Sequence, residues 1–259
     1  MTALVATSAP DPTPAIASLL RALRLPTMGR LWPDLCRQAT AAGWSHARLL
    51  QALLEHEAAE RDQRRIAARR QAAHLPPGKT LASFDTALSP GLDRSRLDAL
   101  AAGDGWIGNG GNILVFGPSG VGKTHLAAAL GHALIDCGHT VLFSRTTDLV
   151  QHLQAARRDL ELPQALAKLD RFDCLVLDDL GYVQKDQAET SVLFELISQA
   201  YERRSLIITC NQPFTQWDAI FPDKSMTVAA VDRLVHHASI IELGGDSYRR
   251  RSAQARKLR

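Results

Sequence analysis

The 259-residue chain lacks the features of a disulfide-stapled or membrane-embedded protein. Its four cysteines, Cys36, Cys137, Cys174 and Cys210, show no CxxC spacing. The last two lie inside apolar runs, so we expect buried, reduced thiols. No apolar run reaches the length of a membrane span, and the N-terminal residues lack the basic segment of a signal peptide. These absences predict a cytoplasmic protein with no membrane partner.

Strong net charge, internal repeats and low-complexity tracts before the tail are also absent. The formal charge is +3, with 46% hydrophobic and 22% charged residues, which is ordinary for a globular protein. The length allows one α/β domain and a smaller appendage. Cations gather in two places that are candidate phosphate-contacting surfaces. They are Arg61, Arg64, Arg65, Arg69 and Arg70, and then Arg249, Arg250, Arg251, Arg256, Lys257 and Arg259.

Composition divides the chain into segments of different character. We expect a disordered N-terminus over 1–15, a helical domain over 16–75, a linker over 76–110, an α/β domain over 111–245 and a basic tail over 246–259. The helical domain carries an apolar stripe at Leu49, Leu50, Leu53 and Leu54. Pro33 and Gly43 are expected to divide it into two or three helices. Trp32 and Trp44 are expected to pack within these helices, and the alternative for both is a role at an interface.

The α/β segment alternates short β-rich runs with helical patterns. The expected strands are 113–116, 140–144, 174–178, 205–210 and 239–243, and the expected helices lie near 123–136, 146–158, 163–170, 188–203 and 226–237. Near-continuous apolar strands are typical of a parallel sheet covered on both faces.

GPSGVGKT follows the first expected strand and opens a helix. It fits the phosphate-binding pattern G-x-x-x-x-G-K-[ST], and its residues are Gly117, Pro118, Ser119, Gly120, Val121, Gly122, Lys123 and Thr124. Glycines let backbone N–H groups point at phosphates, and the helix dipole favours anions there. Lys123 would reach the β- and γ-phosphates of ATP, and Thr124 would bind Mg²⁺. The alternative is a glycine-rich turn without a ligand.

Two adjacent acids, Asp178 and Asp179, end the third expected strand, and Asn211 ends the fourth. Since successive strand side chains point to opposite sides, the two acids can do different jobs. Asp178 would hold Mg²⁺ through a water, and Asp179 would orient or deprotonate an attacking water. By themselves the acids also suit a helix cap or a solvated turn, and Asn211 beside Pro213 also suits ordinary turn chemistry.

The ordered motifs GPSGVGKT, CLVLDDLGY, IITCNQP, VDRLVHH and GGDSYRRR resemble those of the AAA+ ATPases of the IstB group. These are transposition helper proteins of bacterial insertion sequences, and they are similar to helicase loaders of the DnaC type. The resemblance covers residues 16 to 250. It implies a Walker A loop at 117–124, a Walker B pair at Asp178 and Asp179, and sensor 1 at Asn211.

The resemblance also implies roles that residue types alone do not give. Arg233 matches the arginine that reaches the γ-phosphate of a neighbouring subunit, so complete sites would exist only in a homo-oligomer. Without that match it is an ordinary surface arginine. Many AAA+ proteins carry Glu where this chain has Asp179, which makes slow hydrolysis the expectation. Arg249 lies near the place of sensor 2, although a solvated basic tail fits better.

Duplex DNA and an IstA-type transposase on a separate chain are the implied partners. The DNA-contacting candidates form two groups: Arg61, Arg65 and Arg69, and then Arg145, Arg157, Arg158 and Lys168. The alternative for the first group is an exposed helix face whose arginines pair with Glu57, Glu60 and Asp62.

His125, His236 and His237 lack a carboxylate or cysteine at metal-binding spacing, so structural or surface roles are expected. Rival functions are a DnaC-type loader, a small-molecule kinase and a nucleotide-gated scaffold with little hydrolysis.

Overall fold

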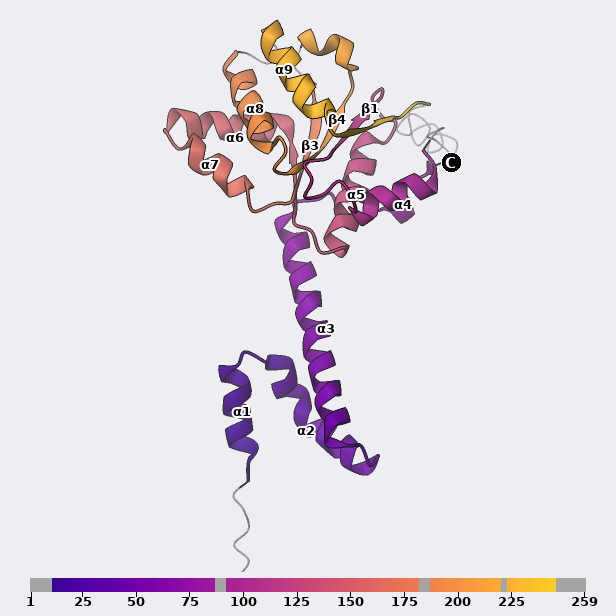
Figure 1. Ribbon diagram of the computed structural model, residues 1–259, viewed down its shortest axis with the longest axis vertical. Coiled ribbons are helices and arrows are strands. Elements are labelled where there is room, and N and C mark those ends of the chain that lie inside the picture. The colour runs from indigo at the N-terminus through magenta and orange to yellow at the C-terminus, as the bar shows by residue number, and fades with distance from the viewer. Residues whose placement is uncertain (1–10, 87–91, 182–186, 220–222, 246–259) are drawn as a thin grey trace, which may run out of the picture. The chain divides into compact units, whose positions relative to one another are not determined.

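A computed structural model describes residues 11–86, 92–181, 187–219 and 223–245 (Figure 1). The chain forms two compact units that divide between Ala67 and Ala68. This division falls inside a helix, whereas the sequence places the domain boundary near residue 76, where Pro76, Pro77 and Gly78 end the helical pattern. Most of the expected disordered N-terminus, the basic tail and Arg249 lie outside the described residues.

The first unit contains α1 (Thr13–Ala22), α2 (Pro26–Ala41) and most of α3 (His46–Ala72). The first helix begins three residues earlier than expected, because Pro14 suits the first turn of a helix, where its missing N–H is not needed. Gly43 lies in the turn between α2 and α3 with φ 60°, as a helix-ending glycine should.

Pro33 does not divide the helices, so that prediction is wrong. It lies inside α2, where it leaves the Gly29 carbonyl without its helical hydrogen bond, a loss that costs about 3 kcal/mol in many helices. Burial offsets this cost: Met28 and Leu35, on either side of Pro33, pack with Leu53 of α3 in one apolar cluster. Tertiary packing therefore outweighs local propensity here.

The apolar stripe of α3 is only half covered within this unit. Leu49 and Leu53 join the cluster, as does Trp32, whereas Leu50 and Leu54 are about half exposed. Trp44 instead lies under the guanidinium of Arg48, with 4.6 Å between the Arg48 Cζ and the ring centroid.

A buried carboxylate fixes the turn between α1 and α2 onto α3. Glu57 is 4% exposed and accepts hydrogen bonds from the backbone N–H groups of Thr27 and Met28, at 2.9 and 3.0 Å. These are among the first N–H groups of α2, whose N-cap, Leu25, provides no side-chain acceptor. Arg61 pairs with Glu57 and donates to the carbonyl of Arg24.

The second unit is built on one five-stranded sheet in the order β2-β3-β4-β1-β5, with every pairing parallel. The strands are β1 (Asn112–Phe116), β2 (Val141–Arg145), β3 (Cys174–Leu180), β4 (Ser205–Cys210) and β5 (Ala238–Glu242). The helices are α4 (Arg94–Ala102), α5 (Lys123–Asp136), α6 (Thr146–Arg158), α7 (Leu162–Leu169), α8 (Gln187–Ala200) and α9 (Lys224–Val235), with short η1 (Leu81–Ser83) and η3 (Phe214–Ala219). The expected parallel α/β core is confirmed.

The strand order explains the two helix layers. The connection from β1 to β2 runs one way across the sheet, and the later connections run the other way, so right-handed crossovers place α5 opposite α6, α8 and α9. Figure 1 shows α4 and α5 on one side of the strands and α6 to α9 on the other. Strands β1, β3 and β4 are buried along nearly their whole length between these layers. No helix among the described residues is both long and apolar enough to cross a bilayer.

The cysteines are free, as expected. Cys174 and Cys210 are buried in β3 and β4, and this burial raises the pKa of both thiols, so they stay protonated at neutral pH. Cys137, by contrast, is exposed at the end of α5.

Candidate functional site

The polar motifs lie at the carboxyl-terminal edge of the parallel sheet, the usual ligand side of open α/β sheets. Because β4 lies between β3 and β1, Asn211 after β4 has the acidic pair on one side and the loop 117–122 on the other. The register agrees, since Cys210 pairs with Phe116 of β1 and with Leu180 of β3. Three motifs that are widely separated in sequence therefore meet along one short stretch of this edge.

The loop after β1 has a backbone that requires glycine. Gly117, Gly120 and Gly122 have φ values of 147°, 89° and 104°. A Cβ atom at Gly117 would lie 2.2 Å from the carbonyl oxygen of Leu243, which follows β5 and donates its own N–H to the Phe116 carbonyl. The close approach of these two segments therefore excludes any side chain at position 117.

Lys123 shows where an anion would bind. Its side chain is buried, and its Nζ donates to the carbonyl oxygens of Gly117 and Pro118, at 2.8 Å each. The loop thus wraps around an ammonium group, and phosphate oxygens would give this ammonium stronger, charged partners. Gly122 caps α5 without a side chain, so the positive end of this helix dipole faces the same loop. The geometry fits a bound triphosphate, with Thr124 in the first turn of α5 available to Mg²⁺.

The two aspartates lie on a bulge in β3. Leu177 pairs with Ile208 and Leu180 with Cys210, so two residues of β3 lie opposite the single Thr209. Asp178 is 4% exposed, whereas Asp179 is half-buried and has a left-handed backbone with φ 59°. The two adjacent carboxylates therefore have different surroundings, one buried and one half-buried.

Thr209 connects the two acids, and sequence reasoning did not identify it. Its Oγ1 donates to Asp178 Oδ1 at 2.7 Å and accepts from the Asp179 backbone N–H at 2.9 Å. Thr146 adds a third anchor by donating to the Asp178 carbonyl at 3.0 Å. Both hydroxyls are buried. The available signal was a threonine inside the otherwise apolar SLIITC, but threonine is common in strands.

Arg233 lies in the last turn of α9. Its Nη1 donates to the Ala229 carbonyl at 2.9 Å, and its Cζ is 5.2 Å from the ring centroid of Phe194 in α8. The side chain is half-buried against its own subunit. These contacts hold it along α9 and alongside α8.

Residues before β1 pack against the phosphate loop. Phe84 is 9% exposed, and a Cβ at Gly122 would be 3.4 Å from its ring. Phe84 also makes an edge-on contact with His125, whose Nε2 lies 3.1 Å from Ser83 Oγ. His125 thus connects η1 to α5, a structural contact of the kind expected.

The arginines proposed to contact DNA have diverse surroundings. Arg61 is bound to Glu57 and Arg24, and Arg65 is paired with Asp62 at 3.4 Å. Arg69 is half-buried in the second unit. The acidic partners named as the alternative for this helix are therefore in place.

The other group does not form one patch. Arg145 precedes α6 and Arg157 and Arg158 end it, a separation of roughly 18 Å along a helix of that length. Arg157 pairs with Glu195 at 2.7 Å, whereas Arg145, Arg158 and Lys168 are exposed.

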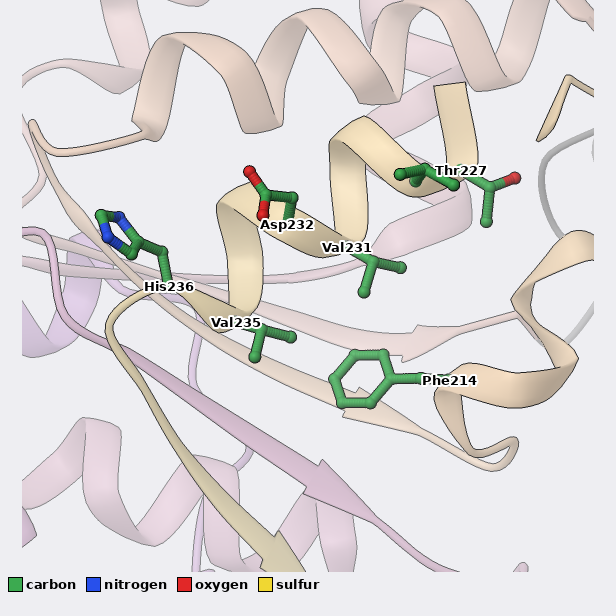
Figure 2. A pocket seen from close by; sticks show the side chains of 7 residues that line it. Phe214, Thr227, Val231, Asp232, Val235 and His236 are labelled. Atoms are coloured by element: carbon green, nitrogen blue, oxygen red, sulfur yellow. The ribbon is translucent and has the colours of Figure 1, made fainter. Parts of the chain in front are cut away.

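An apolar groove of about 480 Å³ follows one face of α9 next to η3. Figure 2 shows Val231, Val235 and Phe214 directed toward the same space, with His236 at the end of the helix. Its lining residues are Phe214, Thr227, Val228, Val231, Asp232, Val235 and His236, and they include no residue of the phosphate loop or the acidic pair.

Comparison with known families agrees with this geometry. The family described as IstB-like ATP binding protein matches residues 18–256. The chain belongs to this family. It is 61% identical over 239 residues to an insertion sequence ATP-binding protein of Sinorhizobium fredii, covering 92% of this chain and 80% of that protein. It is 36% identical over 231 residues to the ATP-binding protein of insertion sequence IS21 of Pseudomonas aeruginosa, covering 89% and 87%.

Solved structures share the fold of this IstB-type chain. DnaA from Aquifex aeolicus with bound AMPPCP aligns with a TM-score of 0.55 at 21% identity, over 71% of this chain and 55% of that chain. DnaI aligns with a TM-score of 0.54 at 20% identity, over 66% and 96%. The second unit therefore has the AAA+ P-loop architecture that the motifs predicted.

Proposed function

We propose that this protein is a magnesium-dependent ATPase that assembles on duplex target DNA and there recruits or stimulates an IstA-type transposase. One observation carries the proposal: the glycine loop holding Lys123, the Thr209-linked aspartates and Asn211 adjoin at one sheet edge. Family membership supports an ATP ligand, and the relatives that are named for insertion sequences support a role in transposition.

The residues divide the work of binding and hydrolysis. Loop N–H groups and Lys123 bind the β- and γ-phosphates, and Lys123 exchanges its carbonyl partners for phosphate oxygens. Thr124 and Asp178 would hold Mg²⁺, which neutralises charge on the phosphates. Asp179 and Asn211 orient or deprotonate the attacking water. Since the Asp179 carboxylate reaches less far than glutamate would, we expect slow hydrolysis that DNA or a partner stimulates.

Assembly completes the site in this proposal. Arg233 would leave its contacts with Phe194 and Ala229 and reach the γ-phosphate of a neighbouring subunit. The cost is small, because a partly exposed cation–π contact contributes about 0.5–1 kcal/mol and a charged pair with phosphate replaces it. ATP would then connect subunits, and hydrolysis would release them or permit the next step.

DNA contact in this proposal is to the phosphate backbone and independent of sequence. Arg145, Arg158 and Lys168 are exposed and suit such contacts. In α3, Arg65 is exposed but pairs with Asp62, and Arg69 is half-buried. Arg157 pairs with Glu195 at the surface, and such ion pairs contribute only about 0–1 kcal/mol and exchange readily for phosphates. Arg61 pairs with the buried carboxylate of Glu57, which is costly to leave unpaired, so Arg61 suits DNA contact less well.

Electron microscopy of the protein on a long duplex, with ATP, ADP or no nucleotide, tests the proposal. We expect ATP-dependent multimers on the duplex, and more phosphate release when duplex DNA is added. Asp179→Asn should assemble but not hydrolyse ATP, and Lys123→Ala should do neither.

A monomer that ignores DNA with every nucleotide would refute the proposal. Preference for single strands together with binding to a hexameric helicase would favour the loader, and phosphate transfer to an acceptor other than water would favour the kinase.

A further inference from the structure

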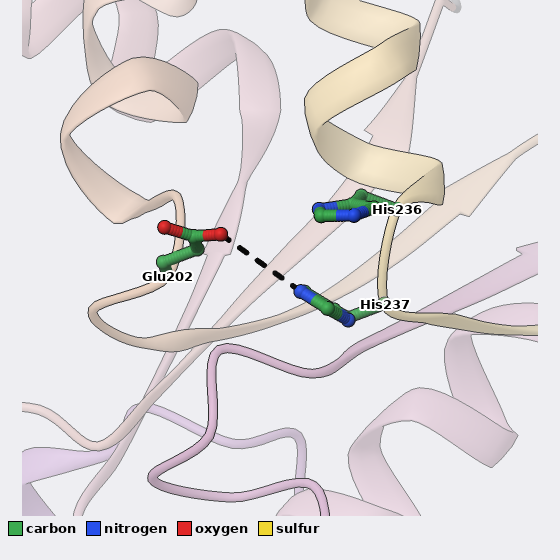
Figure 3. Close-up of side chains that lie close together, drawn as sticks. All are labelled: Glu202, His236 and His237. Atoms are coloured by element: carbon green, nitrogen blue, oxygen red, sulfur yellow. Dashed lines mark ion pairs between the residues drawn. The ribbon is translucent and has the colours of Figure 1, made fainter.

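Three exposed side chains from distant parts of the sequence converge at the edge of the sheet opposite the phosphate loop. Glu202 lies in the turn before β4, and His236 and His237 lie between α9 and β5. Figure 3 shows the carboxylate of Glu202 directed toward the two imidazole rings. Their ligand atoms all lie within 4.8 Å of one another, with 4.0 Å between His237 Nε2 and a Glu202 oxygen.

From this cluster we infer a binding site for a divalent transition metal ion, with zinc as the ion it suits best, formed by Glu202, His236 and His237. Two imidazoles and one carboxylate are a donor set found at zinc sites with three protein ligands and a water. Ligand atoms around tetrahedral zinc lie about 3.3 Å apart, given bonds near 2.0–2.1 Å. The three ligand atoms lie within 4.8 Å of one another, with 4.0 Å for the Glu202–His237 pair, so rotations of the exposed side chains must bring them closer to reach that spacing.

The backbone holds these three residues in place. A Cβ at Gly110 would lie 2.6 Å from the Glu202 Cα, so the turn that carries Glu202 is packed tightly against another segment. The His237 carbonyl accepts from the N–H of Asn112, which starts β1. The His236 N–H bonds the Asp232 carbonyl as the end of α9. Because the backbone is held, binding the ion would require rotation of these side chains and not ordering of the chain, so the entropic cost of binding is small.

Tyr201 completes the arrangement as an outer partner. Its hydroxyl is 2.8 Å from His236 Nδ1. If Nδ1–H donates to the Tyr201 oxygen, the lone pair of Nε2 remains for the metal, which is the usual way a second oxygen orients a ligating histidine. Glu202 supplies one negative charge and the neutral imidazoles none, so the bound ion keeps a net positive charge. The ion would fasten the end of α9, which carries Arg233, to the turn before β4.

Calorimetric titration of the untagged protein with ZnCl₂, without nucleotide or DNA, tests the site independently of the proposed function. We expect one zinc per chain, and cobalt(II) should give the strong visible absorption of a tetrahedral site. Glu202→Gln and His237→Gln should each weaken zinc binding at least tenfold. His152→Gln, which alters an exposed histidine of α6, and Cys137→Ser should leave the affinity unchanged.

Circular dichroism of each variant checks that the fold is retained. Absence of saturable zinc binding would overturn the inference. So would binding that survives both Glu202→Gln and His237→Gln, since the ion would then be held elsewhere. Loss of binding in Cys137→Ser would likewise assign the ion to the exposed thiol.

Discussion

Asp179 has a backbone conformation that few residue types adopt readily. Its φ of 59° lies in the left-handed region, where aspartate and asparagine are several-fold enriched among non-glycine residues. A glutamate there would lose the short side chain that favours this region. The bulge therefore gives a local reason for aspartate at a position where many AAA+ proteins have glutamate, and it makes Asp179→Asn the conservative probe of this carboxylate.

Thr209→Val tests whether the hydroxyl between the aspartates matters for catalysis. Valine has nearly the same shape but removes the donor to Asp178 Oδ1 and the acceptor of the Asp179 N–H. Outer-shell changes of this kind typically cost 10–100-fold in metal affinity or activity, so we expect about a tenfold lower rate of ATP hydrolysis, with a raised Mg²⁺ requirement. Steady-state phosphate release across a Mg²⁺ titration measures both.

Thr209→Ser is the matched control for this prediction, since it keeps the hydroxyl and removes only a methyl group. It should hydrolyse ATP at close to the original rate. A valine variant as active as the parent at low Mg²⁺ would show that Asp178 and Asp179 hold their positions without Thr209.

At the scale of helices, the capping of α2 depends on Glu57, a residue that is distant in sequence. Helix α2 begins after Leu25, which has no capping side chain, and its orphan N–H groups find an acceptor about thirty residues further along the chain. Sequence reasoning considered Glu57 as an ion-pair partner for arginines, which is correct for Arg61. Its larger role as a cap comes from the packing of α2 on α3, which no local pattern encodes.

Glu57→Ala should loosen the start of α2 specifically. Removing a buried acceptor of two backbone N–H groups costs about 1–3 kcal/mol. Hydrogen exchange of the full-length protein should show much faster exchange at Thr27 and Met28, while amides of β1 and β4 keep their protection. Glu55→Ala is the control: Glu55 is exposed on the same helix and accepts only from Gln51 among the described contacts, so exchange in α2 should not change. Equal effects of the two substitutions would contradict the capping role.

For the whole molecule, predictions from periodicity and contiguous motifs agree with the structure. The five strands, the helices that follow them and the phosphate loop depend on short-range patterns and were predicted, whereas α4 lies inside the stretch 76–110 that was expected to be a linker. What the sequence could not give depends on contacts across the fold. Pro33 stays helical because Met28 and Leu35 are buried, and Glu202 lies near His236 and His237 only because β4 and β5 begin at the same edge. The bulge at Asp179 likewise depends on pairing with β4.

The largest-scale prediction concerns active sites shared between subunits. If Arg233 acts on the nucleotide of a neighbour, Arg233→Ala and Asp179→Asn are each inactive alone but complement one another when mixed. In a random one-to-one head-to-tail assembly, about a quarter of the interfaces pair an intact Asp179 with an intact Arg233 from the next subunit. We therefore expect phosphate release to recover to about a quarter of the original rate on duplex DNA.

The control for the mixture separates a shared site from a structural role of Arg233. Mixing Arg233→Ala with a double variant that carries both substitutions provides no intact arginine and should recover nothing. If Arg233 only stabilises α8 against α9 through Phe194, its loss damages its own subunit, and no partner can restore that subunit's activity. Recovery in the first mixture and not in the second therefore requires an arginine that reaches across the interface, and absence of recovery in both would place the role of Arg233 within its own chain.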